Sequence, residues 1–336
     1  MSPRRRPVRP TIYDVAREAG VSKSLVSLVL NDSSLVAEPK RQAVQDAIAK
    51  LGYRRSQAAS ALAADRTRTV GLVIDDFQNP SFVELLRGLR AAVGPQGFHV
   101  AIREHYRDGD TFVNAIDGFL DSQVDALVVA AEPGRDLPTL GVPTVLEGTR
   151  LHRIDDADTV ESDQRHGVDQ LMEHLRSAGH RRIGHVTGAG GAAAVRLEAY
   201  LEAVEAQGEA ARFAGESNET NEDGGYAGAV ELVRRHPDVT AVFAANDTMA
   251  LGARAALREA GREVPRDVAL IGYDNSHLAR SRFLDLTTVD SHAYDAGVAC
   301  GEAILRRLAE PDLPPAAVVV PSTLVVRSSS VTVPRS

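Results

Sequence analysis

From Val70 onward the sequence alternates short apolar runs with amphipathic segments at helical spacing, and this alternation restricts the fold more than any other feature. The run TVGLVID at 69–75 is typical of a strand, and FVELLRGLRAAVGPQGF at 82–98 carries its apolar residues at helical spacing. Strand–helix alternation of this kind predicts parallel sheets with helices on both faces. A second series begins after Ser162, so we expect an α/β body of two doubly wound parallel-sheet lobes with a cleft between them.

The first sixty or so residues follow a different pattern, with three short helical segments. Thr11 can cap the first, with Asp14 three residues on, Gly20 ends it, and Gly52 ends the third. Two short helices joined by a glycine turn form a helix-turn-helix. The predicted buried residues are Ile12, Val15, Ala16, Ala19, Leu25, Val26, Val29, Leu30, Val44, Ala47, Ile48 and Leu51.

The charge is divided unevenly along the chain. Residues 1–69 hold 13 Lys and Arg against 6 Asp and Glu, a net +7, and because the whole chain is −8, residues 70–336 carry −15. A basic head on an acidic body predicts that the head binds a polyanion. The exposed edge of the second helix, from Lys23 to Leu28, would then lie in the DNA major groove, where Lys23 favours guanine. The alternatives are a solvated basic tail and a helical bundle that docks on the protein itself.

An alanine-rich segment follows the third helix. Residues 57–64 hold one large apolar side chain, Leu62, and arginines flank the segment on both sides. So short a helix is unstable alone in water, even when alanine-rich, and we expect it to fold only against a partner. Leu62 would then be a wedge that kinks DNA from the minor groove. A plain interdomain linker is the alternative, although linkers are usually richer in Gly, Ser or Pro.

Several blocks of the sequence resemble the lac and purine repressor family of LacI/GalR-type transcriptional regulators. They are TIYDVAREAGVSKSLVSLVLN (11–31), KRQAVQDAIAKLGYRRSQAASALA (40–63) and VGLVIDDFQNPSFVELLRGL (70–89). Blocks at 162–188, 241–257 and 264–275 match later family blocks in order, so the resemblance runs nearly end to end. It implies an N-terminal all-α helix-turn-helix DNA-binding domain, a hinge helix, and a periplasmic-binding-protein-like body whose last helix returns to the first lobe.

The resemblance also implies which residues contact DNA. Positions matching Lys23, Ser24 and Leu28 face bases in the family, and Leu62 matches its intercalating lever. The predicted DNA-binding residues are Thr11, Tyr13, Ser22, Lys23, Ser24, Ser27, Leu28, Asn31, Arg54, Arg55, Ala59 and Leu62. Two departures matter: Leu28 stands where a polar or basic residue is usual, and Arg55-Ser56 replaces the common Pro-Asn, which weakens the cap of the hinge.

Polar residues follow the predicted strands at their carboxyl ends, where α/β sheets bind ligands. Carboxylates, amides, one arginine and one aromatic ring suit a polyhydroxylated or polar small molecule. The predicted effector-binding residues are Asp75, Phe82, Asp163, Arg196, Asn246 and Asp274. The resemblance supports Phe82, Arg196 and Asp274 most directly. The alternatives are a helix cap for Asn246, a turn residue for Asp274 and a solvated helix residue for Arg196.

The glycine loop at 188–193 raises a different function. Gly188, Gly190 and Ala193 approximate the G-x-G-x-x-A turn of dinucleotide sites, which would make the chain a redox-sensing repressor that binds NAD. The acidic residue that such sites need fits loosely, since Glu216 comes 28 residues after Gly188. Small residues after a strand equally let backbone N–H groups approach any other ligand, and we predict no cofactor.

Catalysis and metal binding are not favoured by the sequence. The G-x-S-x-G nucleophile motif is absent, and the four histidines His166, His174, His180 and His185 lack metal-ligand spacing. Cys300 is the single cysteine, and we expect it to be a small core residue.

We therefore expect a ligand-responsive transcriptional regulator, a repressor that binds a palindromic operator as a homodimer and is released by a small polar effector such as a sugar or polyol. A tetramer is the larger assembly considered, and a non-DNA-binding solute-binding protein is the alternative function. The N-terminus has no signal-peptide pattern, which favours a cytoplasmic protein. The expected domains are a basic disordered tail (1–10), the helix-turn-helix domain (11–56), the hinge helix and linker (57–69), and the body (70–336), with a first lobe of about 70–160 plus 291–320 and a second of about 161–290 plus 321–330.

Overall fold

The computed structural model describes residues 10–30, 35–53, 67–105 and 109–331. The chain divides into two compact units, Met1–Thr67 and Arg68–Ser336, and each is described by itself. None of the helices in these described ranges is long and apolar enough to cross a bilayer.

The first unit contains the three predicted helices, α1 (Ile12–Glu18), α2 (Lys23–Leu30) and α3 (Glu38–Leu51). Thr11 caps α1 through a reciprocal capping box with Asp14, in which each residue's backbone N–H donates to the other's side chain. Gly20, with φ of 64°, makes the left-handed turn between α1 and α2, a conformation that glycine adopts without strain.

The predicted core of this unit is confirmed. Its fully or nearly buried members are Val15, Ala16, Val26, Val29, Val44 and Ala47, with the other predicted apolar residues packed partly buried around them. Val36, which was not predicted, is also buried in this core. Because one face of α2 is spent on this core, Lys23, Ser24 and Leu28 on the opposite face are exposed.

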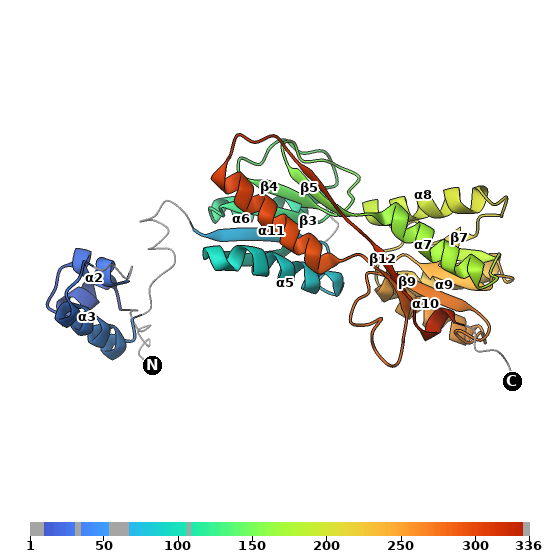
Figure 1. The fold of residues 1–336 in the computed structure, drawn as a ribbon, viewed down its shortest axis with the longest axis horizontal. Coiled ribbons are helices and arrows are strands. Elements are labelled where there is room, and N and C mark those ends of the chain that lie inside the picture. The colour runs from blue at the N-terminus through green and yellow to red at the C-terminus, as the bar shows by residue number, and fades with distance from the viewer. Residues whose placement is uncertain (1–9, 31–34, 54–66, 106–108, 332–336) are drawn as a thin grey trace, which may run out of the picture. The chain divides into compact units, whose positions relative to one another are not determined.

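The second unit contains two six-stranded sheets, drawn at the left and right of the body in Figure 1. The first sheet has the order β11-β5-β4-β3-β1-β2 and is entirely parallel. The second has the order β12-β10-β9-β8-β6-β7 and is parallel except for its edge strand β12. The strands are β1 (Thr69–Ile74), β2 (His99–Glu104), β3 (Ala126–Ala130), β4 (Thr144–Glu147), β5 (Asp158–Ser162), β6 (Ile183–Val186), β7 (Phe213–Ala214), β8 (Ala241–Ala244), β9 (Ala269–Tyr273), β10 (Thr287–Asp290), β11 (Ala317–Val320) and β12 (Thr323–Val325).

Helices cover both sheets. The helices α5, α6 and α11 belong to the first lobe, and α7 to α10 belong to the second (Figure 1). Their bounds are α5 (Ser81–Val93), α6 (Gly109–Asp121), α7 (Gln164–Ser177), α8 (Gly191–Glu205), α9 (Glu222–Arg235), α10 (Asp247–Glu259) and α11 (Ala293–Ala309). Short 3-10 turns follow at η1 (Gly94–Gln96) and η2 (Ser328–Ser330). Cys300 on α11 is fully buried in the first-lobe core, as predicted.

The chain passes between the lobes three times, between β5 and α7, between β10 and α11, and between β11 and β12. Two hydrogen bonds join these crossings: Ser162 Oγ donates to the Ser291 carbonyl at 2.6 Å, and Asp163 N donates to the Val320 carbonyl at 2.9 Å. The short strands β5, β10, β11 and β12 were not predicted, because each is stabilised by pairing with residues far away in the sequence.

Candidate functional site

The exposed edge of α2 is the part of the first unit that sequence analysis assigned to DNA. Lys23 and Tyr13 lie together there: Lys23 Nζ donates to Tyr13 Oη at 3.3 Å and lies 5.0 Å from the centroid of its ring. Tyr13 and Leu28 remain 64% and 42% exposed. Ser22 uses its hydroxyl to accept from Leu25 N, and so caps α2.

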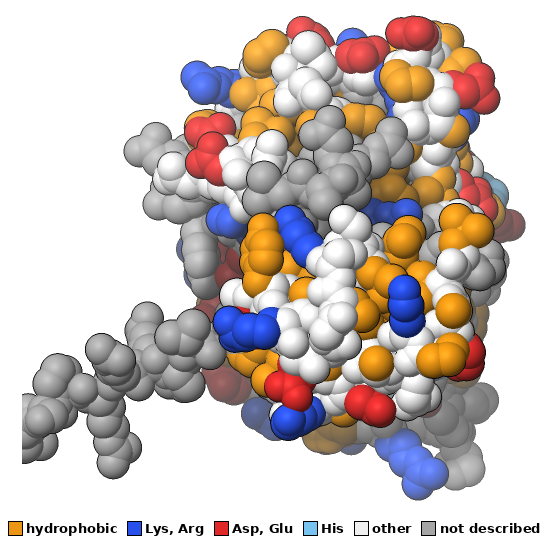
Figure 2. Space-filling view, turned by 90° about the vertical axis from the view of Figure 1, so that its left-hand side faces the viewer, with side chains coloured by type: hydrophobic (Ala, Val, Ile, Leu, Met, Phe, Trp, Pro, Cys, Tyr) orange, Lys and Arg blue, Asp and Glu red, His pale blue; other side chains and the backbone are white. Residues whose placement is uncertain are grey.

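The other predicted DNA contacts divide into two groups. Thr11, Ser24 and Ser27 lie in the described part of the first unit, and Thr11 is engaged in the α1 cap. The predicted contacts Asn31, Arg54, Arg55, Ala59 and Leu62 lie outside the described residues. On the face shown in Figure 2, Lys and Arg side chains are spread among hydrophobic and uncharged ones and, among the described residues, form no single patch.

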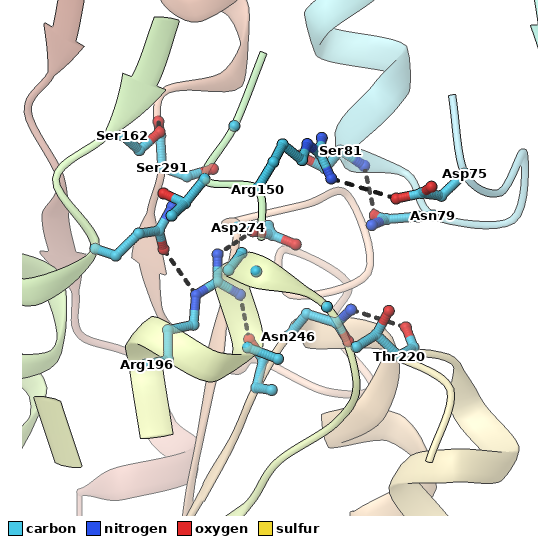
Figure 3. Close-up of a pocket in the computed structure, with 18 of the residues that line it drawn as sticks. Asp75, Asn79, Ser81, Arg150, Ser162, Arg196, Thr220, Asn246, Asp274 and Ser291 are labelled. Atoms are coloured by element: carbon cyan, nitrogen blue, oxygen red, sulfur yellow. Dashed lines mark hydrogen bonds and ion pairs between the residues drawn. The ribbon is translucent and has the colours of Figure 1, made fainter. Parts of the chain in front are cut away.

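A polar pocket lies between the lobes of the second unit, at the carboxyl ends of their strands. Its cavity of about 130 Å³ is smaller than a typical drug-sized site. Figure 3 shows side chains entering it from both sheets, with Asp75, Asn79, Ser81 and Arg150 from the first lobe and Arg196, Thr220, Asn246 and Asp274 from the second. The predicted residues Asp75, Phe82, Arg196, Asn246 and Asp274 all line this cavity.

Arg196, on α8, is the fixed cation of the second lobe. It is only 7% exposed, which excludes the solvated alternative. Its Nε donates to Gln164 Oε1 at 2.8 Å, one Nη donates to the Ala245 carbonyl, and the other lies 3.6 Å from Asp274 Oδ1. Its guanidinium carbon also lies 3.6 Å from the centroid of the Tyr273 ring, a cation–π contact. Arg196 therefore presents a fixed charge at the pocket wall.

Asp274 follows β9 in a left-handed conformation, with φ of 100°. Burial raises the pKa of its carboxyl, the Arg196 guanidinium lowers it, and Asp290 raises it further. Behind it, burial raises the pKa of Asp247 to about 7, with Asp274 adding to the rise. Asp247 accepts hydrogen bonds from Ser276 N at 2.7 Å and Thr288 Oγ1 at 2.6 Å. Asp274 thus has the Arg196 guanidinium as its ion-pair partner at the cavity wall and a second buried carboxyl, Asp247, close behind it.

Arg150 forms a matching group in the first lobe, which sequence analysis missed. Its Nε donates to the Glu147 carbonyl at 2.8 Å, and its two Nη atoms lie 3.3 Å from Asp75 Oδ2 and 3.5 Å from Glu147 Oε2. Burial raises the pKa of Glu147; Arg150 lowers it, and Asp274 and Asp75 raise it. Glu147 is the last residue of β4 and Arg150 follows the predicted strand at 142–148, and these positions at a strand end were the available signal.

Glu132 lines the cavity and was also not predicted from the sequence. Its carboxylate is engaged with neighbouring groups of the first lobe. Its carboxylate accepts from Leu151 N, His152 N and His152 Nδ1 at 2.9 to 3.1 Å, and its own N–H donates to Asp75 Oδ1 at 3.0 Å. Asp75 therefore holds the loops after β3 and β4 together. Further lining residues that were not predicted include Asn79, Ser81, Thr149, Ser162, Gln164 and Ser291.

Two predicted residues also serve as helix caps. Asn246 caps α10 by accepting from Met249 N at 2.7 Å, and its amide donates to the Thr220 carbonyl at 2.9 Å. It therefore both caps a helix and lines the cavity. Asp163 caps α7 by accepting from His166 N at 3.0 Å, and it is not among the cavity-lining residues.

The glycine loop between β6 and α8 needs a small residue at position 191 because the first lobe packs closely against it. A Cβ atom on Gly191 would lie 2.3 Å from the Thr149 carbonyl oxygen and 2.7 Å from Arg150 Cα. Gly191 belongs to the second lobe and Thr149 to the first, so only glycine permits this backbone approach across the pocket. The loop residues from Ala189 to Ala193 line the cavity with backbone and small side chains.

The histidines do not form a metal site. In the described ranges, no group of three or more His, Cys, Asp and Glu side chains is arranged to hold a metal ion. His185 is fully buried, stacks on Phe243 with ring centroids 4.2 Å apart, and its Nδ1–H donates to the Phe243 carbonyl at 3.0 Å. Burial lowers the pKa of its imidazole to about 4, with the Arg196 charge contributing, so it is a neutral core residue at pH 7.

Comparison with known proteins covers both units. Residues 11–56 match the family described as bacterial regulatory proteins, lacI family, and residues 172–330 match the periplasmic binding protein-like domain. The HTH-type transcriptional regulator CelR of Thermobifida fusca is 35% identical over 96% of this chain and 98% of its own length. The ribose operon repressor of Escherichia coli strain K12 is 32% identical over 90% of this chain and 94% of its own.

A solved structure has the same architecture. The transcriptional regulator CelR–cellobiose complex superimposes with a TM-score of 0.69 at 30% identity, covering 96% of this chain and 100% of that one. The expected fold class, a helix-turn-helix unit followed by a periplasmic-binding-protein-like body, is confirmed.

Proposed function

The chain belongs to the lacI family of bacterial regulatory proteins and is a ligand-responsive DNA-binding transcriptional regulator. We propose that a small polar molecule bound in the interlobe cavity controls the affinity of the protein for operator DNA. The relatives at this identity are transcriptional regulators, not enzymes.

The observation that carries this proposal is the cavity lined from both lobes. A ligand that bridges Arg196 and Asp274 on one side with the Arg150 group on the other binds best at one separation of the lobes. Because it binds that state preferentially, it shifts the population toward it. Coupling of this kind is reciprocal, so the operator weakens effector binding by the factor that the effector weakens operator binding.

A sugar or polyol is the effector class that the cavity supports. Its walls offer carboxylates, amides and hydroxyls, which pair with ligand hydroxyl groups that can both donate and accept. The Phe82 ring at the rim can cover an apolar face of a sugar. Relatives named for cellobiose and ribose agree with this class.

We infer that α2 is the recognition helix and lies in the DNA major groove. Its proposed base-facing residues are Lys23, Ser24, Ser27 and Leu28, and the neighbouring contacts are Thr11, Tyr13 and Ser22. Arg54 and Arg55 would contact phosphates, and Leu62 would kink the operator from the minor groove. Asn31 and Ala59 are the remaining predicted DNA contacts. Since Lys23 lies against the Tyr13 ring, these two side chains would meet DNA as a pair.

A homodimer is the assembly that fits a palindromic operator. Exposed apolar side chains on both lobes support it: Phe77 and Val83 on the first lobe are 57% and 52% exposed, and Val230 and Phe283 on the second are 46% and 70% exposed. Burial of such side chains against a second copy would be favourable. Sedimentation equilibrium at micromolar concentration tests the dimer.

The experiment that tests the function starts by selecting palindromic duplexes that bind the protein from a random pool. Neutral sugars and polyols are then screened for release of the selected duplex, followed by fluorescence anisotropy. We expect at least one to weaken operator binding by roughly tenfold or more, the ordinary size of allosteric coupling. Selection of no specific duplex, or a bound sugar that leaves operator affinity unchanged, would contradict the proposal.

Leu62→Gly separates the two halves of the proposal. We expect it to lose specific operator binding while the body still binds ligand, because the wedge acts only on DNA. Lys23→Ala serves as the comparison: it should change which operator bases matter, whereas an equal loss on every sequence would make Lys23 a phosphate contact.

A further inference from the structure

The two arginines of the pocket are both occupied by groups of the protein itself. Arg196 places its three guanidinium nitrogens against Gln164, the Ala245 carbonyl and Asp274. Arg150 places its three against the Glu147 carbonyl, Asp75 and the Glu147 carboxylate. Phosphate recognition favours a guanidinium whose two Nη atoms face the ligand. Here a carbonyl or carboxylate of the protein already lies against each Nη atom of both arginines.

We propose that Asp75 and Glu147 set the charge class of the effector: by occupying the Arg150 guanidinium, they exclude phosphorylated and other anionic ligands from a pocket that accepts uncharged ones. The inference rests on the proposed function only in taking this cavity as the effector site. It assigns Asp75 as a specificity residue that acts through Arg150, not only as a ligand contact.

The charges that line the cavity support this assignment. The carboxylates are Asp75, Glu132, Glu147 and Asp274, and the cations are Arg150 and Arg196, so four acidic groups face two basic ones. An incoming anion would approach a surface that already carries excess negative charge. Like charges brought together without solvent are an effective means of rejecting a wrong ligand.

The state of the carboxylates points the same way. The pKa values of Glu147 and Asp274 are raised by burial, and each is raised further by neighbouring carboxylates, Asp274 and Asp75 for the first and Asp290 for the second. The nearby guanidiniums only partly offset these effects. Both carboxyl groups thus already lie close to other acidic groups, and the negative charge of an added phosphate would add to that repulsion.

Uncharged hydroxyl groups meet no such barrier. Each carboxylate oxygen has about two lone-pair sites, so Asp75 and Glu147 can accept from a ligand hydroxyl while they hold Arg150. Freed from these carboxylates, the same Arg150 would become a cation at the cavity wall able to bind an oxyanion.

Inorganic phosphate is the probe that needs no knowledge of the natural effector. Its affinity is measured by phosphorus NMR titration, against chloride at equal ionic strength, for the wild-type protein and for the double variant Asp75→Asn with Glu147→Gln. We expect the double variant to bind phosphate at least about tenfold more tightly than the wild type, since two repelling charges are gone and Arg150 is released. Adding Arg150→Gln to that variant should abolish the gain.

A matched control removes two negative charges elsewhere on the same lobe. Asp117 and Asp121 are exposed on α6 and do not line the cavity, so Asp117→Asn with Asp121→Asn should leave phosphate affinity unchanged. Phosphate held by the basic first unit is common to all these proteins and cancels in the comparison. Urea unfolding of each variant, and of the single substitutions at Asp75 and Glu147, shows whether the fold of the body is retained.

Matched pairs of sugars extend the test to whole ligands: D-ribose with D-ribose 5-phosphate and D-glucose with D-glucose 6-phosphate. Calorimetry should give no phosphorylated member an affinity above that of its neutral partner in the wild type. The proposal is overturned if wild type and double variant bind phosphate equally, if the α6 control gains as much, or if a phosphorylated sugar binds the wild type more tightly. In each case effector control of the operator could still hold, because only the ligand class would have been wrong.

Discussion

The two walls of the cavity carry the same chemical pair, a guanidinium held by carboxylates, but they are built differently. In the second lobe, Arg196 projects from the regular helix α8 and is locked against Tyr273, Gln164 and a strand-end carbonyl. In the first lobe, Arg150 lies in the loop after β4 and is held only by acidic residues and their backbone. We therefore expect the position of Arg196 in the second lobe to be fixed. The position of Arg150 in the first lobe depends on ion pairs that a bound ligand can alter.

The largest expected difference between the walls appears when each arginine is removed. Arg196→Ala leaves Asp274 buried without its partner, which should lower the free energy of unfolding of the second lobe by about 3–5 kcal/mol. Arg150→Ala should cost less, about 1–3 kcal/mol, since Asp75 keeps the Glu132 N–H as a donor. Urea unfolding of the two variants measures the difference.

Arg196→Ala should also keep operator binding and lose the ligand response, because the first unit is separate from the body. Equal destabilisation by the two substitutions would show that the walls do not differ in rigidity. A ligand response that survives Arg196→Ala would remove Arg196 from the binding site.

Acid should weaken the second lobe through His185. Its pKa is about 4 when folded and about 6.5 when unfolded, so the unfolded chain binds more protons between these values. Stability from this group is complete above pH 6.5 and falls as the pH drops to 4, by about 3 kcal/mol. In His185→Leu that loss should be absent.

The raised pKa of Asp247 acts in the opposite direction, favouring the folded state as the pH falls from about 7. The test is therefore the difference in unfolding free energy between wild type and His185→Leu at pH 7 and at pH 4.5, in which Asp247 cancels. A difference that does not change with pH would mean that the fold does not lower the pKa of His185.

Closure of the two walls should depend on Gly191. A methyl group at this position would overlap the Thr149 carbonyl of the other lobe, so Gly191→Ala should hold the lobes apart and weaken effector binding by roughly tenfold, or about 1.4 kcal/mol. Small-angle scattering of the body should show a larger radius of gyration.

Gly188→Ala is the matched control. Its added Cβ would also be crowded, but by Thr220, Asn218 and Met249, which all belong to its own lobe. It should reduce stability without opening the cleft. If both variants open the cleft equally, the contact of Gly191 with the first lobe is not what closes it.

The smallest effect is expected at Asp163, which lies where the chain crosses between the lobes. Asp163→Ala should cost about 1 kcal/mol through loss of the α7 cap and leave effector affinity unchanged. Calorimetric titration with a sugar identified by the release screen checks this. Loss of affinity beyond the loss of stability would restore Asp163 as an effector contact, as the sequence predicted.

The difference between the walls also explains what could be read from the sequence. The helix-turn-helix core and the strand–helix alternation follow from local periodicity. Arg196 on the helix α8 and Asp274 directly after the strand β9 lie at positions that the resemblance to the family indicated. Arg150 and Glu132 were not assigned to the site because residues in loops after strands show no hydrophobic periodicity. Their contacts with Asp75 also depend on side-chain directions that the sequence does not reveal. Asp163 was expected in the site because it lies between the lobes, but its carboxylate turns back to a backbone N–H of its own helix. The proposed domain boundaries and DNA contacts remain predictions.

The first sheet has one geometric consequence for signalling. Its strand β1 begins at Thr69, directly after the segment that joins the units, and ends beside the cavity at Ile74 and Asp75. Six residues of strand span about 20 Å, so a tilt of about 8° pivoting at the cavity would displace Thr69 by roughly 3 Å. If the sheet moves as a rigid body, a small rearrangement around a bound molecule would displace the start of β1. That displacement is comparable to the length of a hydrogen bond.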